Sequence, residues 1–139
     1  CWMFGATLAH AWGENRDSGA ALPQMPPLDT RLSANFNLRR WSFGLLFRAV
    51  AAQERIAQNQ GNVTGRDLGP SKGFATLAIN GGFRLHPDAQ LTAGIDNVFD
   101  RSYSEHLNLS GNADFGFPAD PQRINEPGRM LWVRLGLTY

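Results

Sequence analysis

The side chains of this 139-residue chain that could bind a metal ion are soft donors, spread thinly along the sequence. They are one cysteine, three methionines and three histidines: Cys1, Met3, Met25, Met130, His10, His86 and His106. Thiolate and thioether sulfur favour reduced copper, and imidazole is a further ligand for it. No two histidines or methionines stand at a tight ligand spacing, so the sequence predicts no complete metal site. Met25, His106 and Met3 are the candidates for single metal contacts.

Each of these candidates also has a structural explanation. Met25 lies in a proline-rich stretch, where it could anchor a loop by hydrophobic packing, and His106 could hydrogen-bond within a loop. Met3 lies among small residues that would pack. Glu105, His106 and Asp114 could be combined as a hydrolytic site, but no serine or cysteine stands in a recognisable nucleophile elbow. We therefore expect a protein that is not an enzyme.

The elements that must position these side chains are β-strands, because apolar residues alternate with small or polar ones along most of the chain. The alternation covers residues 1–13, 32–38, 41–50, 74–85, a segment from about residue 91, and residues 130–139. All eight prolines fall between these segments, where a missing backbone donor does no harm. Asn80-Gly81 is a hairpin dipeptide, but too short a stretch follows it, so residues 74–85 are expected to form one strand.

The predicted connections alternate in length. Tight turns join the strands near residues 38–41 and 86–90, whereas the connections at roughly 14–29, 52–72 and 97–128 are long. Short turns at one end and long loops at the other are typical of an antiparallel outer-membrane barrel. The chain would then end on the periplasmic side.

Aromatic residues on the apolar face are expected to form girdles at the two rims of the membrane. They are Trp2, Trp12, Trp41, Phe83 and Tyr139. If Trp2 and Trp12 lie on one tilted strand, their ten-residue separation spans ~25 Å, the height of the apolar band of such barrels. Arg48, Arg84 and Arg134 fall on the opposite face, which would line a wet lumen.

Composition narrows the class of protein. The 13 basic and 12 acidic residues nearly cancel, which argues against a nucleic-acid binder. Only Lys72 is a lysine, and charged residues make up just 18% of the chain, which is unusual for a surface in water. Alternation alone also fits a soluble β-sandwich or a lipocalin-like barrel, in which the apolar face would be the core.

Motifs near the end of the chain resemble those of TonB-dependent outer-membrane receptors. Asp96-Asn97-Val98-Phe99-Asp100-Arg101-Ser102-Tyr103 resembles their asparagine-hydrophobe-Phe-Asp motif, and Asn125-Glu126-Pro127-Gly128-Arg129 resembles the element that leads into their final strand. Val133, Leu135, Leu137 and Tyr139 resemble the aromatic-ended signal for barrel insertion. Other stretches are similar to the copper receptors of this family: residues 11–15, 22–28, 49–62, 104–108 and 115–120.

This resemblance implies an energy-coupled importer, with a barrel of roughly 22 strands around a plug domain. Residues 1–139 would supply the last six strands, and the plug and the TonB box would lie outside the sequence given. The expected location is the outer membrane of a Gram-negative cell, with copper as transported ligand and no cofactor. TonB, the barrel assembly machinery and lipopolysaccharide would be partners. A siderophore or cobalamin receptor, a passive porin-like barrel and a soluble ligand-binding β-barrel are the alternatives.

Five residues of these motifs have predicted structural roles. Asn97 and Asp100 are expected to order the start of the last long loop through hydrogen bonds from side chain to backbone. In the alternating pattern of the last strand, Arg129 falls on the apolar face at the outer rim, where it would meet lipid phosphate. Pro127-Gly128 provides a bend before the final strand.

Overall fold

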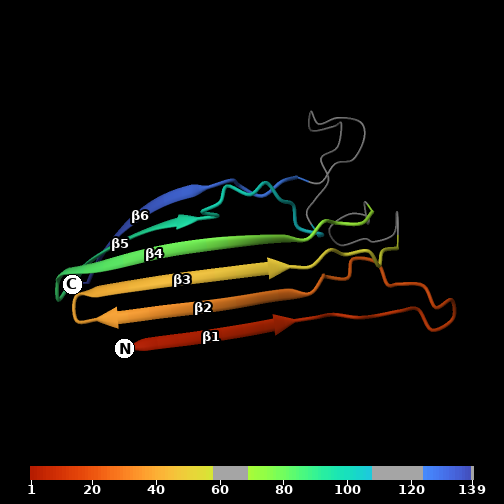
Figure 1. The fold of residues 1–139 in the computed structure, drawn as a ribbon, viewed down its shortest axis with the longest axis horizontal. Coiled ribbons are helices and arrows are strands. Elements are labelled where there is room, and N and C mark those ends of the chain that lie inside the picture. The colour runs from red at the N-terminus through yellow and green to blue at the C-terminus, as the bar shows by residue number, and fades with distance from the viewer. Residues whose placement is uncertain (58–68, 108–123, 139) are drawn as a thin grey trace.

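The computed structural model describes residues 1–57, 69–107 and 124–138, which contain one antiparallel sheet whose strands follow each other in chain order (Figure 1). The strands are β1 (Trp2–Ala9), β2 (Asp29–Leu38), β3 (Trp41–Val50), β4 (Phe74–His86), β5 (Ala89–Asp96) and β6 (Met130–Leu137). The described part of the chain holds no helix with the length and apolar character needed to cross a membrane.

The observed strands follow the predicted ones closely, with one clear exception. β4 runs without interruption through Asn80-Gly81, as predicted. β1, however, ends at Ala9, so the prediction that this strand continues to Gly13 is wrong. Ala9 pairs with Asp29, the first residue of β2, and beyond this pair the strand has no partner to continue the ladder. Trp12 therefore lies in a loop, and its distance from Trp2 does not measure the height of the apolar band.

The two ends of the sheet differ in the way their strands are connected. Two-residue turns, Arg39-Arg40 and Pro87-Asp88, join β2 to β3 and β4 to β5 at the end drawn on the left of Figure 1. Long connections join the other pairs of strands at the opposite end, and the last strand runs back toward the tight turns (Figure 1). This arrangement confirms the predicted alternation of short turns and long loops.

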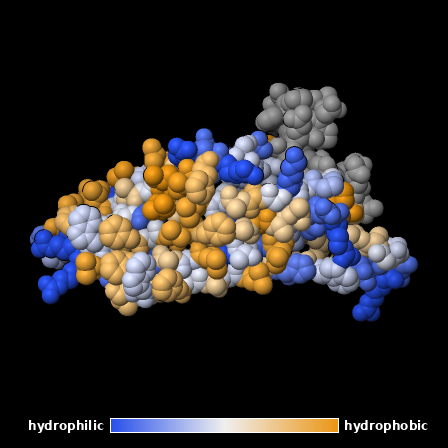
Figure 2. All heavy atoms as spheres, in the orientation of Figure 1, coloured by the Kyte–Doolittle hydropathy of each residue, from blue (hydrophilic) through white to orange (hydrophobic). Residues whose placement is uncertain are grey.

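The strand register gathers the apolar side chains on one face of the sheet. Phe36 of β2 lies opposite Phe43 of β3, which lies opposite Gly81, then Ala93 and Val133. This face is bare in the isolated chain, because Phe4 is 74% exposed and Val133 is 72% exposed. Figure 2 shows hydrophobic residues spread over the strands and hydrophilic ones prominent at both ends of the molecule. An apolar surface of this size requires a cover such as lipid.

The opposite face carries polar and small residues, as predicted. One row across the sheet consists of Asn35, Gly44, Asn80, Gly94 and Trp132. Small residues are needed here: a Cβ atom on Gly94 would lie 2.6 Å from Cε2 of Trp132. Arg48, Arg84 and Arg134 share this face, since they pair with Thr76, Gln90 and Thr92.

Aromatic rings cluster on the apolar face at the tight-turn end. The ring centroids of Trp41 and Phe83 are 4.5 Å apart, and those of Trp2 and Phe36 are 4.7 Å apart. The fifth predicted girdle residue, Tyr139, lies outside the described residues. Inside the described part of the chain, the buried hydrophobic residues are Val50 and Phe74, which lie at the long-loop end of the sheet.

Candidate functional site at the long-loop end

Hydrogen bonds connect the loops at the outer end of the sheet to one another. Gln53 Nε2 donates to the carbonyl oxygen of Met25 at 2.9 Å. The backbones of Gln53 and Ser71 exchange two hydrogen bonds of 3.0 Å each. Ser71 Oγ in turn lies 3.1 Å from Nδ1 of His106, and both residues are buried. Four separate loop segments are thus held in a fixed order across the end of the sheet.

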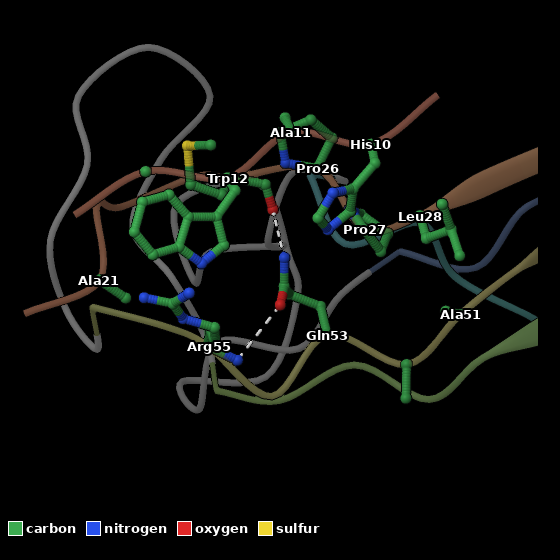
Figure 3. Close-up of a pocket in the computed structure, with 13 residues that line it drawn as sticks. His10, Ala11, Trp12, Ala21, Pro26, Pro27, Leu28, Ala51, Gln53 and Arg55 are labelled. Atoms are coloured by element: carbon green, nitrogen blue, oxygen red, sulfur yellow. Dashed lines mark hydrogen bonds between the residues drawn. The ribbon is translucent and has the colours of Figure 1, made fainter. Parts of the chain in front are cut away.

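A cavity of about 210 Å³ lies between the β1–β2 and β3–β4 loops and is called here the loop cavity. Its lining includes His10, Trp12, Met25, Gln53 and Arg55. The guanidinium carbon of Arg55 lies 4.8 Å from the centroid of the Trp12 ring, a cation–π contact. Figure 3 shows this pair together, while His10 stands apart from it. Trp12, predicted as a girdle residue, is here a wall of the loop cavity.

The donor set of the loop cavity includes a thioether and an imidazole, both suited to reduced copper. They do not form a finished coordination sphere. The described residues contain no cluster of three or more histidine, cysteine, aspartate or glutamate side chains that could hold a metal ion. The loop cavity thus brings together one thioether and one imidazole, and its function as a metal contact stays a prediction.

A second cluster centres on Arg48 on the polar face of the sheet. Its Nη2 lies 2.7 Å from Oδ2 of Asp29 and 3.2 Å from Oε2 of Glu105, while its Nη1 donates to Oε1 of Glu105. Arg31 holds the same Asp29 carboxylate at 3.1 Å. The side chains of Arg48 and Asp29 are only 20% and 18% exposed. Charge-assisted bonds with this geometry are stronger than those between neutral groups.

Glu105 belongs to residues 101–107, a segment called here the strap, which contacts Arg48 of β3 and Phe74 of β4 at the long-loop end of the sheet. The ring of Tyr103 stacks on Phe74, with centroids 4.2 Å apart, and Arg48 lies over the same Phe74 ring. Burial raises the pKa of the Tyr103 phenol, and the nearby carboxylates of Glu126 and Glu105 raise this pKa further. The phenol is therefore held in its neutral form.

Two sharp bends position the strap. Asn97 and Asp100 both adopt left-handed backbone conformations, with φ of 50° and 53°. The amide of Asn97 exchanges two hydrogen bonds with the backbone of Arg101, and Asp100 Oδ1 accepts from the backbone N–H of Arg129 at 2.7 Å. The hydrogen bonds expected of these two side chains are thus present, and they connect the strap to the start of β6.

The candidates for metal contact do not come together. Met25 lines the loop cavity, His106 is buried beside Ser71, and Met3 is 64% exposed on the polar face of β1, opposite Asn35. The contacts between Arg48 and Glu105 are not predictable from the sequence, because the two residues are 57 positions apart and belong to no common motif.

Other residues of the terminal motifs have varied positions. Phe99 is 69% exposed, Glu126 donates its backbone N–H to the carbonyl of Tyr103, and Arg129 is exposed. Asp114, Tyr139 and the whole copper-receptor stretch at residues 115–120 lie outside the described residues, as do parts of residues 49–62 and 104–108.

The sheet has one apolar face and one polar, glycine-rich face, with tight turns at one end and ordered loops at the other. This is the wall of an outer-membrane β-barrel. Comparison with solved structures identifies the family. The chain is 45% identical to the copper transporter OprC, with a TM-score of 0.91, and the match covers 99% of this chain and 21% of that one. No protein-family model matches the chain, and no curated protein matches it in sequence.

Two further structures share the fold at lower identity. They are the ferric citrate transporter FecA and the ferric enterobactin receptor of Pseudomonas aeruginosa. FecA is 19% identical, with a TM-score of 0.73, over 98% of this chain and 21% of its own. The enterobactin receptor is 16% identical, with a TM-score of 0.71, over 99% and 20%. The chain therefore spans about a fifth of the length of the relatives it matches. It is a barrel segment of a TonB-dependent receptor of the outer membrane, as its terminal motifs predict.

Proposed function

We propose that this chain forms barrel wall and outer loops of a TonB-dependent importer that takes up copper. The observation that carries the proposal is the 45% identity to the copper transporter OprC along 99% of this chain. Two of the ferric-siderophore proteins reach only 16% and 19% over a similar stretch, a level at which the fold alone is shared. The alignment behind the 45% identity covers the loops as well as the strands.

The loops provide chemical support for this proposal. A copper ion that approaches the long-loop end meets the loop cavity, where Met25 and His10 offer a thioether and an imidazole. Isolated soft donors suit a transport route, because an ion that is held by few ligands leaves readily. In this proposal Met25 is a transient copper contact at the mouth, and no residue of this chain acts in catalysis or holds a cofactor.

The remaining partners follow from the same proposal. TonB would act on a part of the complete receptor outside these residues, and the barrel assembly machinery would read the final strand, β6. The exposed apolar face of the sheet would lie against lipid, with lipopolysaccharide around the long-loop end.

Copper uptake by cells tests the proposal. A strain that lacks the complete receptor is compared with the same strain carrying it, and cellular copper and zinc are measured under copper limitation, with and without TonB. We expect a several-fold rise in copper alone, which disappears without TonB. A receptor that instead restores growth on a ferric siderophore, with no change in copper, is a siderophore importer. Uptake that persists without TonB indicates a passive barrel.

The role of Met25 is tested separately. Met25→Leu removes the thioether and keeps the apolar volume, so we expect uptake to need a higher external copper concentration while the maximal rate stays the same. Met130→Leu, which changes a methionine outside the loop cavity, is the matched control. Equal uptake curves for Met25→Leu and the unmodified receptor would assign Met25 to loop packing alone.

A further inference from the structure

Two adjacent arginines lie at the tight-turn end of the sheet, away from the loops that the proposed transport uses. Arg39 and Arg40 form the β2–β3 turn, and the carbonyl of Arg40 accepts the backbone N–H of Arg84 at 2.8 Å, which brings β4 beside this turn. Arg39 and Arg40 are exposed and are called here the turn arginines. The side chain of Arg84 belongs to the polar face of β4 and is not one of them.

The turn arginines are not neutralised within the described part of the chain, where the ion pairs involve other residues. The acidic residue in the neighbouring β4–β5 turn, Asp88, lies 3.4 Å from His86. The tight-turn end therefore presents a concentrated positive charge, although the chain as a whole has a formal net charge of only +1.

The backbone of this turn is unfavourable for arginine. Arg39 has a φ of 30°, on the left-handed side, where glycine and asparagine are the usual residues. A two-residue hairpin turn is better served by Asn-Gly or Asp-Gly, so Arg-Arg is not explained by turn formation. An unfavourable backbone conformation that persists at a charged residue points to a role of the side chain.

The arginines also lie where the apolar face of the sheet ends. Trp41 follows Arg40 directly and contacts Phe83, which precedes Arg84, with ring centroids 4.5 Å apart. Trp41 also stacks with Phe43 farther along the apolar face. Indole rings prefer the level of lipid headgroups, and guanidinium groups bind phosphate through two parallel hydrogen bonds. Charge and aromatic rings are thus placed as the headgroup and the upper acyl chains of a lipid require.

We propose that the turn arginines bind the phosphate headgroup of an anionic phospholipid, whose acyl chains lie against Trp41 and Phe83. A zwitterionic lipid brings its own positive charge and does not complement the two uncompensated turn arginines, whereas phosphatidylglycerol does. This inference rests on the proposed membrane-embedded importer, and it adds a lipid specificity that transport alone does not require.

The test uses the complete receptor, purified, delipidated and placed in nanodiscs of phosphatidylcholine alone or mixed with phosphatidylglycerol. Bound lipids are identified by native mass spectrometry, and the unfolding midpoint is measured in both compositions. We expect retained phosphatidylglycerol and a higher midpoint in its presence. Arg39→Gln with Arg40→Gln should lower the preference for phosphatidylglycerol roughly thirty-fold, since each arginine near an anionic lipid surface contributes about a factor of five.

The matched control is Arg16→Gln with Arg101→Gln, which removes the same charge from the long-loop end and should keep the full preference. An equal loss in this control, or an unchanged preference in the turn variant, overturns the inference. Stabilisation by discs that contain phosphorylated lipid A, through the same two arginines, overturns the assignment to phospholipid. Copper binding by the same samples separates the two proposals. A receptor that binds copper without any lipid preference contradicts this inference alone, and one that enters neither disc contradicts the membrane location on which both rest.

Discussion

Replacing Glu105 by alanine should release the strap from the sheet. In the structure, the carboxylate of Glu105 is held by both terminal nitrogens of Arg48, and its side chain is 36% exposed, while that of Arg48 is 20% exposed. At a separation near 3 Å and an effective dielectric constant of about 20, the attraction is roughly 5 kcal/mol before other terms are counted. Desolvation of the guanidinium and ordering of the glutamate side chain offset most of this, which leaves about 1–2 kcal/mol.

This free energy sets the expected change in local opening. A loss of about 1–2 kcal/mol corresponds to a roughly 5- to 30-fold faster exchange of amide hydrogens that are protected only while the strap is in place. The backbone N–H of Glu126 is one such reporter, because it donates to the carbonyl of Tyr103 at 2.8 Å. Hydrogen exchange of the complete receptor in detergent, followed by mass spectrometry on peptides that contain residues 124–127, measures this change.

Two comparisons make the measurement decisive. Glu14→Ala removes a more exposed and longer ion pair, with Arg55 at 3.8 Å, and should leave exchange at Glu126 within about twofold of the unmodified receptor. In a background of Arg48→Met, Glu105→Ala should add little, because the partner of Glu105 is already missing. Unchanged exchange at Glu126, or an equal effect of Glu105→Ala in both backgrounds, would refute the reasoning.

Three further predictions concern the sheet, the strap and the outer rim. Gly94→Leu should destabilise the barrel by about 1–3 kcal/mol because the new side chain meets the rigid ring of Trp132. Gly136→Ala should be tolerated, because its Cβ would lie 3.8 Å from the carbonyl oxygen of Gln90, and the unfolding midpoint of the receptor distinguishes the two variants. The pKa of Tyr103 is raised above its ordinary value of 10.0 chiefly by burial, so folding favours the neutral phenol. This stabilisation is complete below the ordinary pKa of 10.0 and is lost as the pH rises through the raised pKa. The difference in unfolding midpoint between the unmodified receptor and Tyr103→Phe should therefore be constant below pH 10.0 and shrink as the pH rises above it. Arg129→Glu should weaken stability in the outer membrane more than Arg134→Glu if Arg129 meets lipid phosphate, and the reverse order of unfolding midpoints would contradict that placement.

Short-range patterns made the strands predictable. β3 and β4 follow directly from alternation, because each side chain on a strand points to the face opposite its neighbour whatever lies elsewhere in the chain. The hydrogen bonds of Asn97 were predictable for a similar reason, since short polar side chains bond to backbone close by in sequence. Both inferences need only local information. The backbone partner of Asp100, Arg129, is 29 positions away, and local information does not identify it.

The contacts that could not be predicted from the sequence depend on residues far apart in the chain. β1 ends at Ala9 because β2 begins at Asp29, and nothing in residues 10–13 signals that the pairing stops. Trp12 continues the alternation that places Trp2 on the apolar face, yet it packs against Arg55 in a loop. The Arg48–Glu105 pair joins a strand to a loop with 57 positions between them, and periodicity carries no information about such a contact.

The two faces of the sheet differ in composition because they have different neighbours. Lipid offers no hydrogen bonds, so the face toward it holds apolar residues, and specific recognition there is confined to the rims, where Arg39 and Arg40 adjoin Trp41. The polar face has water and protein as neighbours, so it can keep charged groups such as Arg48 and Asp29 within the sheet itself. The strap uses those charges to fix loops over the polar face. Because its anchors, Glu105 and Tyr103, lie on the loop side, changes to them should alter the order of the loops while leaving the barrel wall intact.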